Sequence, residues 1–468
     1  MKAQLLIDFG STNTKLTLVD LENETIAATA MAHTTVETDV IHGYHEALKL
    51  LMVQVPDAEI IGKKACSSAA GGLKMVAIGL AQALTTEAAK RAALGAGARV
   101  LASFHGDLRE DQVQELLALR PDVILLAGGT DGGNQTCILH NAALLAPYLR
   151  TQSPKPRADK EIPLLVAGNA QTKPLLEEIL AGVPYTFAEN VMPKVNVLNV
   201  QDCRTKIQNI FIHHITKAPG MTDIQAEVSD IIMPTPAAVL QAARLLSEGT
   251  PNEPGIGDLI LVDIGGATTD VHSLSEGLPT NDAFLTGLEE PYAKRTVEGD
   301  LGMRYSIASL FANIPSPLYD ALFSSWSKDE IQAWIDHRKD HTEYVPLASE
   351  PQEQAFDQAV AKVCAALALS RHTGRQRRIY GMPCFSFNQE GKDLRAVPTL
   401  LGTGGILVYS DHGKEILQEA LTLTEPKALT PKAPRILLDR YYILSAMGLL
   451  AESDPDLALR ILKKELGK

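Results

Sequence analysis

The chain has 468 residues, of which 45% are hydrophobic, 21% are charged and 5% are aromatic, a composition that suits a globular protein with a large buried core. Its 43 basic and 56 acidic residues give a net charge of −13. This balance argues against general nucleic-acid binding, because proteins that wrap a polyanion carry a basic excess. No segment approaches the roughly 20 apolar residues of a membrane span, and the first residues do not match a signal peptide.

The cysteines and histidines predict neither a disulfide framework nor a metal centre. Five cysteines lie far apart without a C-x-x-C pair, which indicates a reducing compartment. Histidine pairs such as His213 and His214 lack a third ligand close in sequence and do not match a zinc site. We therefore predict a cytoplasmic protein that binds neither nucleic acid nor membranes.

The first segment of the chain predicts a β-meander around a turn of small residues. Residues 3–9 are apolar, residues 10–13 are turn-forming, and residues 14–20 alternate between apolar and polar side chains, which is typical of a hairpin. Residues 25–32 predict a third strand, and residues 39–54 predict an amphipathic helix.

A different pattern between residues 96 and 195 predicts an inserted α/β subdomain. Residues 122–129 and 163–169 are short apolar runs that end in glycine-containing loops, as buried parallel strands do. Thr130 and Asp131 in the first loop are candidates for binding a metal ion or a partner's backbone, or else they only complete a turn. We expect this insert to contact a protein partner.

The sequence also contains a long-range duplication. Residues 5–20 and 259–274 each consist of an apolar strand that ends in aspartate, a turn of small residues and a second strand. A Gly- and Pro-rich break at residues 247–258 precedes the second copy. We therefore predict two related α/β halves, the first at residues 1–95 plus 196–246 and the second at residues 247–438. Residues 96–195 form the insert, and residues 439–468 form C-terminal helices that pack back on the first half.

The turns of the two hairpins are suited to phosphate groups. Turns of Gly, Ser and Thr expose successive backbone N–H groups, which form a concave site for phosphate oxygens. Two facing turns would hold phosphates from both sides, and Asp8 and Asp263 would converge there and require Mg²⁺ as a counter-charge. Lys15 either touches a phosphate or faces solvent. The candidate phosphate-binding residues are Gly10, Ser11, Thr12, Asn13, Lys15, Gly265, Gly266, Ala267, Thr268 and Thr269.

A third element follows these hairpins in the chain. Residues 399–410 predict a strand, a glycine-rich turn and the start of a helix. Glycine lets the backbone approach a flat ligand closely. The candidate ligand-binding residues of this turn are Gly402, Thr403, Gly404 and Gly405.

Together the three elements resemble the phosphate-1, phosphate-2 and adenosine motifs of the superfamily that contains actin, heat-shock ATPase chaperones and sugar kinases. The resemblance implies a duplicated, ribonuclease H-like α/β fold with ATP and Mg²⁺ in the cleft between the halves. Residues 232–246 resemble the connecting helix of the chaperone branch, but Met233 stands where those chaperones have a glutamate. Glu298 and Asp300 are candidates for the missing water-positioning carboxylate, or Asp300 only caps a helix.

Five further sequence blocks point to one family within this superfamily. Through these blocks the chain resembles, from residue 4 to beyond residue 450, the MutL (GlmL) family of accessory proteins of adenosylcobalamin-dependent glutamate mutase. The resemblance implies a slow Mg²⁺-dependent ATPase that acts as a chaperone and reactivates the mutase, or a related aminomutase, by driving release of damaged cobalamin. Its catalytic residues would be Asp8, Asp263, Glu298 and Asp300. The blocks lie at residues 65–80, 122–134, 296–304, 371–375 and 391–394.

Two other functions of the same fold stay open. A small-molecule kinase needs a base beside the acceptor hydroxyl, and the sequence contains no motif that identifies such a base. The second alternative is an actin-like filament protein, which would have a structural role in the cell. An activator of radical dehydratases is disfavoured, because the cysteines are too widely spaced for its iron–sulfur cluster.

Overall fold

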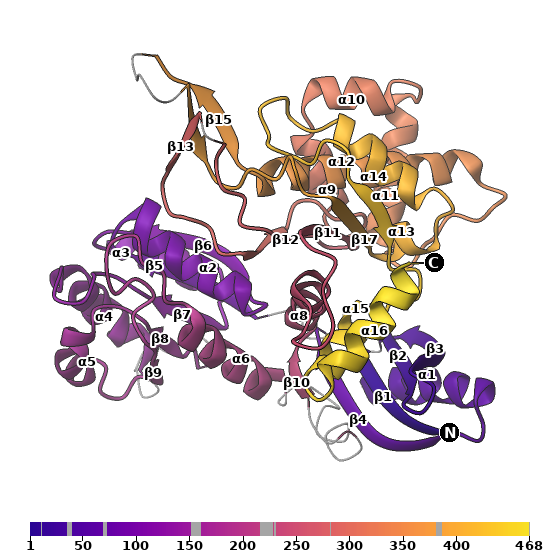
Figure 1. The fold of residues 1–468 in the computed structure, drawn as a ribbon. Coiled ribbons are helices and arrows are strands. Elements are labelled where there is room, and N and C mark those ends of the chain that lie inside the picture. Colours follow the sequence, from indigo (N-terminus) through magenta and orange to yellow (C-terminus); the bar gives the residue numbers. More distant parts are fainter. Residues whose placement is uncertain are drawn as a thin grey trace.

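Two five-stranded sheets of the same topology build the two halves of the molecule in the computed structural model (Figure 1). The strand order is β10-β4-β1-β2-β3 in the first half and β14-β12-β11-β17-β18 in the second. In each sheet the first strand of the half pairs antiparallel with the second and parallel with the fourth. This repetition confirms the predicted duplicated α/β fold. The structure describes all residues except 11, 35–39, 69–72, 151–160, 216–227, 229–230, 281, 381–385 and 468.

The elements of the two halves have the following bounds. The first half contains β1 (Lys2–Phe9), β2 (Asn13–Asp20), β3 (Thr25–His33), α1 (Val40–Gln54), β4 (Glu59–Ser67), β10 (Ile231–Pro234) and α8 (Thr235–Glu248). The second half contains β11 (Leu259–Ile264), β12 (Thr269–Leu274), β14 (Ala293–Glu298), α9 (Ile307–Asn313), α10 (Ser316–Phe323), α11 (Lys328–Asp340), α12 (Pro351–His372), β17 (Thr399–Thr403), α13 (Gly405–Tyr409), α14 (Gly413–Thr422) and β18 (Arg435–Leu438).

Alternating side chains of the central strands join the two halves through a shared core. In β1, Leu5 and Ile7 belong to the core that contains α1, whereas Leu6 belongs to the shared core. In β11, Val262 packs with α12 and Leu261 enters the shared core. Helices α8, α15 (Leu444–Ala451) and α16 (Pro455–Leu466) fill this core between the two sheets (Figure 1). The C-terminal helices therefore contribute to both halves.

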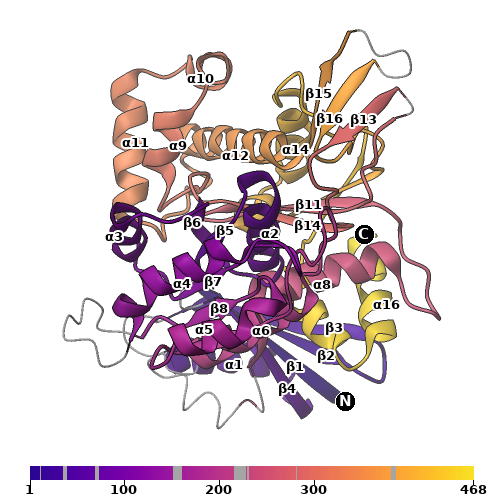
Figure 2. The ribbon, with the colours of Figure 1, turned by 90° about the vertical axis from the view of Figure 1, so that its left-hand side faces the viewer.

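The insert is a fully parallel sheet of order β6-β5-β7-β8-β9. Helices cover it, and in Figure 2 the insert lies in front of the two halves. Its elements are β5 (Lys74–Gly79), α2 (Glu87–Gly95), β6 (Arg99–His105), α3 (Glu110–Ala118), β7 (Val123–Leu126), α4 (Thr136–Leu149), β8 (Leu164–Val166), α5 (Lys173–Ile179), β9 (Tyr185–Phe187) and α6 (Gln201–Ile215).

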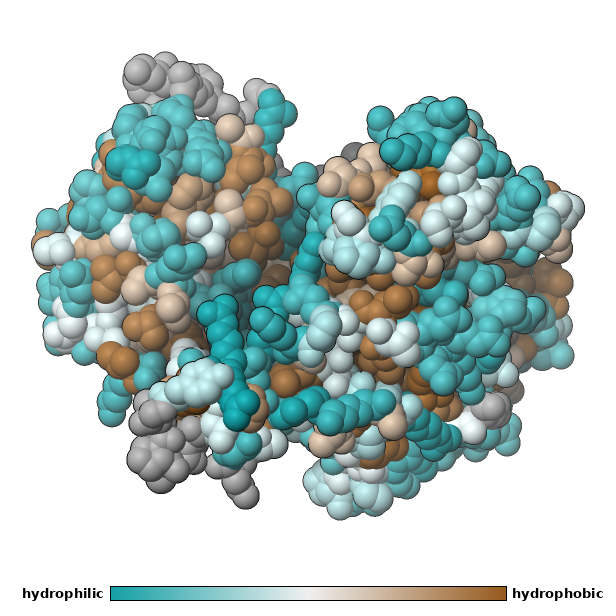
Figure 3. All heavy atoms as spheres, turned by 90° about the horizontal axis from the view of Figure 1, so that it is seen from above, coloured by the Kyte–Doolittle hydropathy of each residue, from teal (hydrophilic) through white to brown (hydrophobic). Residues whose placement is uncertain are grey.

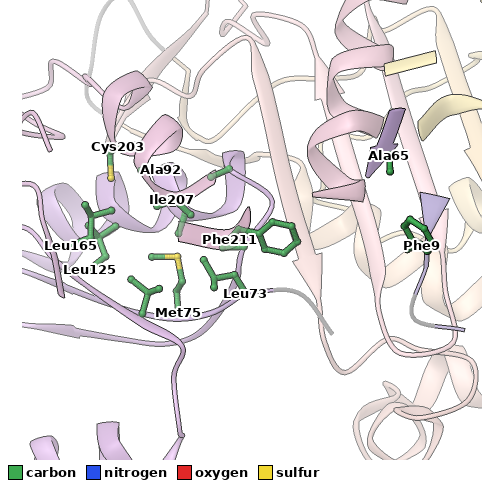
Figure 4. Close-up of a cluster of buried hydrophobic side chains, with 14 of the residues drawn as sticks. Phe9, Ala65, Leu73, Met75, Ala92, Leu125, Leu165, Cys203, Ile207 and Phe211 are labelled. Carbon is green, nitrogen blue, oxygen red and sulfur yellow. The ribbon is translucent and has the colours of Figure 1, made fainter. Parts of the chain in front are cut away.

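The predicted boundaries of the insert at residues 96 and 195 were too narrow. Strand β5 and helix α2 belong to the insert, because β5 pairs with both β6 and β7. Helix α6 also packs on the insert: Ile207 and Phe211 lie beside Leu73 and Met75 (Figure 4). An apolar run shows that a strand is buried but not which sheet it joins, so the sequence pattern did not reveal this boundary.

A third, smaller sheet projects from the second half (Figure 2). It contains β13 (Ala283–Thr286), β16 (Phe387–Glu390) and β15 (Arg375–Arg378), in that order. The sequence analysis did not predict this sheet. Among the described residues, no helix is long and apolar enough to cross a membrane.

Candidate functional site

The two predicted phosphate turns have the same backbone closure. The Gly10 N–H donates to the Asn13 carbonyl at 3.1 Å, and the Gly265 N–H donates to the Thr268 carbonyl at 2.9 Å. A Cβ atom on Gly10 would lie 2.5 Å from the Asn13 oxygen, so this position requires glycine. We call residues 10–13 the first turn and residues 265–268 the second turn. Ser11 lies outside the described residues.

Segment 303–306 is hydrogen-bonded to the carbonyl groups of the second turn. The Met303 N–H bonds the Gly265 carbonyl at 3.1 Å, and the Arg304 and Tyr305 N–H groups bond the Gly266 carbonyl at 2.8 and 2.9 Å. The Ser306 hydroxyl donates to the Ala267 carbonyl at 2.7 Å. The three carbonyls of Gly265, Gly266 and Ala267 are therefore all occupied by protein donors.

The carboxylate of Asp8, at the end of β1, is almost fully buried and held from several elements. The Thr235 hydroxyl at the start of α8 donates to its Oδ1 at 2.6 Å, and the Ser445 hydroxyl on α15 donates to its Oδ2 at 3.0 Å. The Lys15 ammonium lies 3.6 Å from Oδ2. These contacts fix the carboxylate beside the first turn. Sequence analysis missed Thr235 and Ser445, because their distance from Asp8 along the chain gives no local signal.

Lys15 does not face solvent, so the second of its two predicted environments is wrong. Its Nζ atom lies 3.6 Å from the centre of the Tyr442 ring, a cation–π contact. Burial alone would lower the pKa of Lys15, but Tyr442, Asp8 and Asp263 together raise it above its ordinary value. Lys15 is therefore a fixed positive charge at the site.

The carboxyl group of Asp263, at the end of β11, has a strongly raised pKa. Burial raises its pKa to about 7, and the neighbouring carboxylates of Asp270, Asp8 and Asp439 contribute to this shift while Lys15 opposes it. In the strand ladders Asp8 faces Lys15, whereas Asp263 faces Asp270. The second hairpin thus has a carboxylate where the first has an ammonium group.

The donor set fits Mg²⁺ with most of its water retained. Asp8 and Asp263 interact electrostatically, and Mg²⁺ commonly takes one or two carboxylates together with waters and phosphate oxygens. A dedicated protein cage is not present: the described part of the chain has no group of three or more His, Cys, Asp or Glu side chains placed to hold a metal ion. Asp8 and Asp263 are therefore the residues that would hold the ion together with a nucleotide.

The glycine-rich segment at the end of β17, residues 402–405, lies against the second hairpin. Thr403 pairs with Asp263 in the β11–β17 ladder. Gly404 has a φ of +97°, and a Cβ there would lie 2.3 Å from the Ile264 carbonyl oxygen. Gly405, the first residue of α13, would point a Cβ into open space. We call this segment the adenosine turn, because it occupies the position that the sequence resemblance gives to adenosine.

Asp439 is a site residue that the sequence analysis missed. It follows β18, is 1% exposed, and accepts the Thr403 hydroxyl at 3.2 Å and the backbone N–H groups of Ile443 and Leu444. Burial raises its pKa. The available signal was the run RILLD at residues 435–439, which repeats the pattern of an apolar strand ending in aspartate. Asp439 joins the adenosine turn to the start of α15.

Glu298 and Asp300 are both engaged by Arg371. The Arg371 guanidinium lies 2.8 Å from Glu298 and 2.7 Å from Asp300. Burial raises the pKa of Glu298, whereas the Arg371 hydrogen bond lowers the pKa of Asp300. Their predicted role in positioning water stays a prediction, and Met233 is buried in β10 without adding a carboxylate.

The loop of Thr130 and Asp131 is closed by its own hydrogen bonds. The Asp131 carboxylate accepts the Ala170 N–H and the Asn190 amide, both at 2.9 Å. The Thr130 carbonyl accepts the Gly133 N–H at 2.9 Å. These contacts favour the turn-forming role that the sequence analysis left open.

The fold and the paired turns define a two-lobed α/β protein, in which two halves of the same sheet topology each contribute a glycine-containing turn. Comparison with known proteins then assigns the family. The chain belongs to the MutL family: the model described as MutL protein matches residues 4–466. Protein MutL of Clostridium tetanomorphum is 49% identical over 474 residues, which cover 100% of both chains.

Solved structures are much more distant. Nucleotide-free acetone carboxylase is 12% identical with a TM-score of 0.41, over 96% of this chain and 70% of that one. The activator of 2-hydroxyisocaproyl-CoA dehydratase from Clostridium difficile, with bound ADPNP, is 10% identical with a TM-score of 0.32, over 99% and 97%. A ROK family glucokinase from Streptomyces griseus is 11% identical with a TM-score of 0.31, over 97% and 98%. The family assignment does not rest on these likenesses.

Proposed function

We propose that this chain binds ATP and Mg²⁺ between the first and second turns, hydrolyses ATP slowly, and uses this cycle to reactivate an adenosylcobalamin-dependent mutase. The observation that carries the proposal is the meeting of Asp8, Lys15 and Asp263 beside two turns of matching geometry. Membership of the MutL family supports the choice of partner, because the sequence blocks resemble the accessory protein of glutamate mutase.

Each part of the site has a distinct task towards the nucleotide. The N–H groups of the second turn bind phosphate oxygens, and the Lys15 ammonium neutralises phosphate charge. The adenosine turn offers backbone to the base and ribose. Mg²⁺, when bound between Asp8 and Asp263, would offset their negative charge and that of the phosphates.

The link from ATP to the mutase rests on the two-lobed architecture. Radical chemistry is carried by the cofactor, so a mutase that holds damaged cobalamin must be opened before the cofactor can be exchanged. A γ-phosphate that both turns hold favours a closed arrangement of the halves, and its loss removes that preference. A partner bound across the halves or the insert would then experience a change in affinity.

The test measures phosphate release from Mg²⁺–ATP by the purified chain, with and without glutamate mutase inactivated by damaged cobalamin. Stimulated release together with recovered mutase activity is the expected result. ATP binding without stimulation would reject the mutase as partner. Phosphate transfer to a small-molecule acceptor would then favour a kinase, and nucleotide-dependent sedimentation would favour a filament.

Asp263→Asn is the variant for the nucleotide part of the proposal. Loss of the carboxylate should lower phosphate release about 100-fold or more, because it removes a ligand for the ion that offsets the phosphate charge. Asp57→Asn, at an exposed position outside the site, is the matched control and should keep full activity. Equal phosphate release by both variants would contradict the assignment of Asp263.

A further inference from the structure

A second polar site lies between the insert and the second half. A cavity of about 530 Å³ is bounded by α2 and the start of β6 on one side and by β14 on the other, with Arg204 of α6 and Arg371 of α12 completing the wall. Seen from above, a hollow separates the lobe at the left from the lobe at the right, with mainly hydrophilic residues around its middle (Figure 3). A volume in this range suits a small-molecule ligand.

The cavity is strongly cationic in an otherwise acidic chain. Three carboxylates line it, and cations already engage them: Arg91 bonds Glu87 and Glu290, and Arg371 bonds Glu298. The seven cations that line it are Lys90, Arg91, Arg99, Arg204, Lys294, Arg295 and Arg371. The wall therefore has a surplus of positive charge.

Three of these cations form no ion pair within 4.0 Å among the described residues: Lys90, Arg99 and Arg204. The Arg204 Nε atom is buried without a hydrogen-bond partner. Its guanidinium lies directly over Gly95, where an added Cβ would come within 2.5 Å. Burial lowers the pKa of Arg204, and the like charge of Arg244 adds to this effect. Leaving such a cation uncompensated is costly.

The remaining unpaired cations approach the same cavity from other directions. Arg99, at the start of β6, places its Nη2 atom 2.9 Å from where a Cβ on Gly299 would lie. Lys90 lies on α2 and is close enough to Glu298 to stabilise its charge. The three cations therefore come from three elements, and guanidinium groups suit phosphate and carboxylate groups in particular.

Two contacts fix the walls of the cavity relative to each other. Arg91 of α2 donates to the Glu289 carbonyl at 2.9 Å. Arg295 of β14 donates to the Leu94 carbonyl at 3.1 Å and to the Asp270 carboxylate at 2.6 Å. Helix α2 of the insert is therefore hydrogen-bonded to β14, the edge strand of the second sheet, and to the loop that precedes it.

We propose that this cavity binds a small molecule that carries two or more acidic groups, phosphates or carboxylates, through Lys90, Arg99 and Arg204. No residue of the two turns lines this cavity, although the candidate carboxylate Glu298 and its partner Arg371 belong to its wall. The proposal does not depend on the proposed ATPase function. A bound anion would pair with the surplus cations and add a bridge between the insert and the second half.

The test is a calorimetric titration of the full chain with inorganic pyrophosphate and, separately, with citrate. We expect at least one probe to bind, and Arg99→Met and Arg204→Met to weaken it about tenfold or more. Lys90→Met should also weaken binding of the probe, but by less than either arginine variant. Arg377→Met, an exposed arginine on β15, is the matched control and should leave binding unchanged.

Lys15→Met separates this site from the nucleotide site. Binding that survives Lys15→Met and is lost in Arg99→Met supports the cavity, and the preferred probe then shows whether phosphate or carboxylate is recognised. Binding that only Lys15→Met weakens belongs to the turns and would overturn the proposal, as would the failure of both probes to bind. Arg99 and Lys90 are exposed, so their variants keep the test valid if Arg204→Met does not fold.

Discussion

Lys15 and Asp270 occupy the same place in two copies of one hairpin and have opposite charges. Lys15 is held by Asp8 and the Tyr442 ring, whereas Asp270 is bound by Arg295. The positive charge that the first copy carries beside its turn is therefore absent from the second copy.

Replacing Lys15 with Met tests this role directly. The variant keeps most of the apolar stem but loses the ammonium group, so we expect MgATP affinity to fall roughly tenfold, about 1.4 kcal/mol. Equilibrium binding of a fluorescent ATP analogue measures the effect. Lys49→Met on α1, outside the turns, is the control, and unchanged affinity in Lys15→Met would show that Lys15 serves only Asp8.

Lys392 gives the protein a pH dependence of its own. It is 1% exposed and donates to the Ser275 and Tyr292 carbonyls at 2.5 and 2.7 Å, and burial lowers its pKa to about 7. Because its pKa in the unfolded chain is near 10.5, the unfolded chain binds the extra proton between these values. Stability is therefore lost as the pH falls from about 10 towards 7.

Denaturant unfolding of the wild type and of Lys392→Met over this pH range checks the prediction. The stability of the wild type relative to the variant should rise with pH, by on the order of 1 kcal/mol per pH unit. Below pH 7 the difference should become constant. Parallel pH profiles across the whole range would show that the Lys392 amine stays charged in the folded protein.

At the scale of elements, the adenosine turn offers two adjacent glycines with opposite requirements. Gly404 combines a φ of +97° with a Cβ position 2.3 Å from the Ile264 oxygen, whereas Gly405 faces open space. Gly404→Ala should lower the free energy of unfolding by about 1–3 kcal/mol or more and weaken ATP binding. Gly405→Ala should stay within about 0.5 kcal/mol of the wild type. Thermal and denaturant unfolding of both variants decides this.

The sequence was most informative where function depends on neighbouring residues. Both hairpins, the aspartates that end their first strands and the glycine-rich turn follow from short-range patterns. Thr235 and Ser445 reach Asp8 from positions 227 and 437 residues away, and only tertiary packing brings them there. The same reason explains Arg371, which engages Glu298 from 73 residues away. The predicted start of the insert at residue 96 was wrong, because the residues of a buried strand such as β5 do not show which strands it pairs with.

At the scale of the whole molecule, the C-terminal helices act as part of the core rather than as an appendage. Leu459 of α16 is fully buried in the shared core, whereas its neighbour Arg460 forms a partly exposed ion pair with Glu24 at 2.6 Å. Leu459→Ala should cost about 2–5 kcal/mol of unfolding free energy. Arg460→Met should cost less than about 1 kcal/mol. Equal losses in urea unfolding would mean that α16 is held by charge instead of apolar packing.

The hydrogen bond between Ser445 and Asp8 also sets an order of events during protein synthesis. Ser445 is the 437th residue that the ribosome adds after Asp8, and reaching it takes roughly 20–90 s at about 5–20 residues per second. Throughout this time the first turn exists without α15, and the apolar face that α15 later covers stays open. The growing chain therefore acquires its complete Asp8 environment only in the last stage of translation, and until then it is itself a candidate client for the cell's general chaperones.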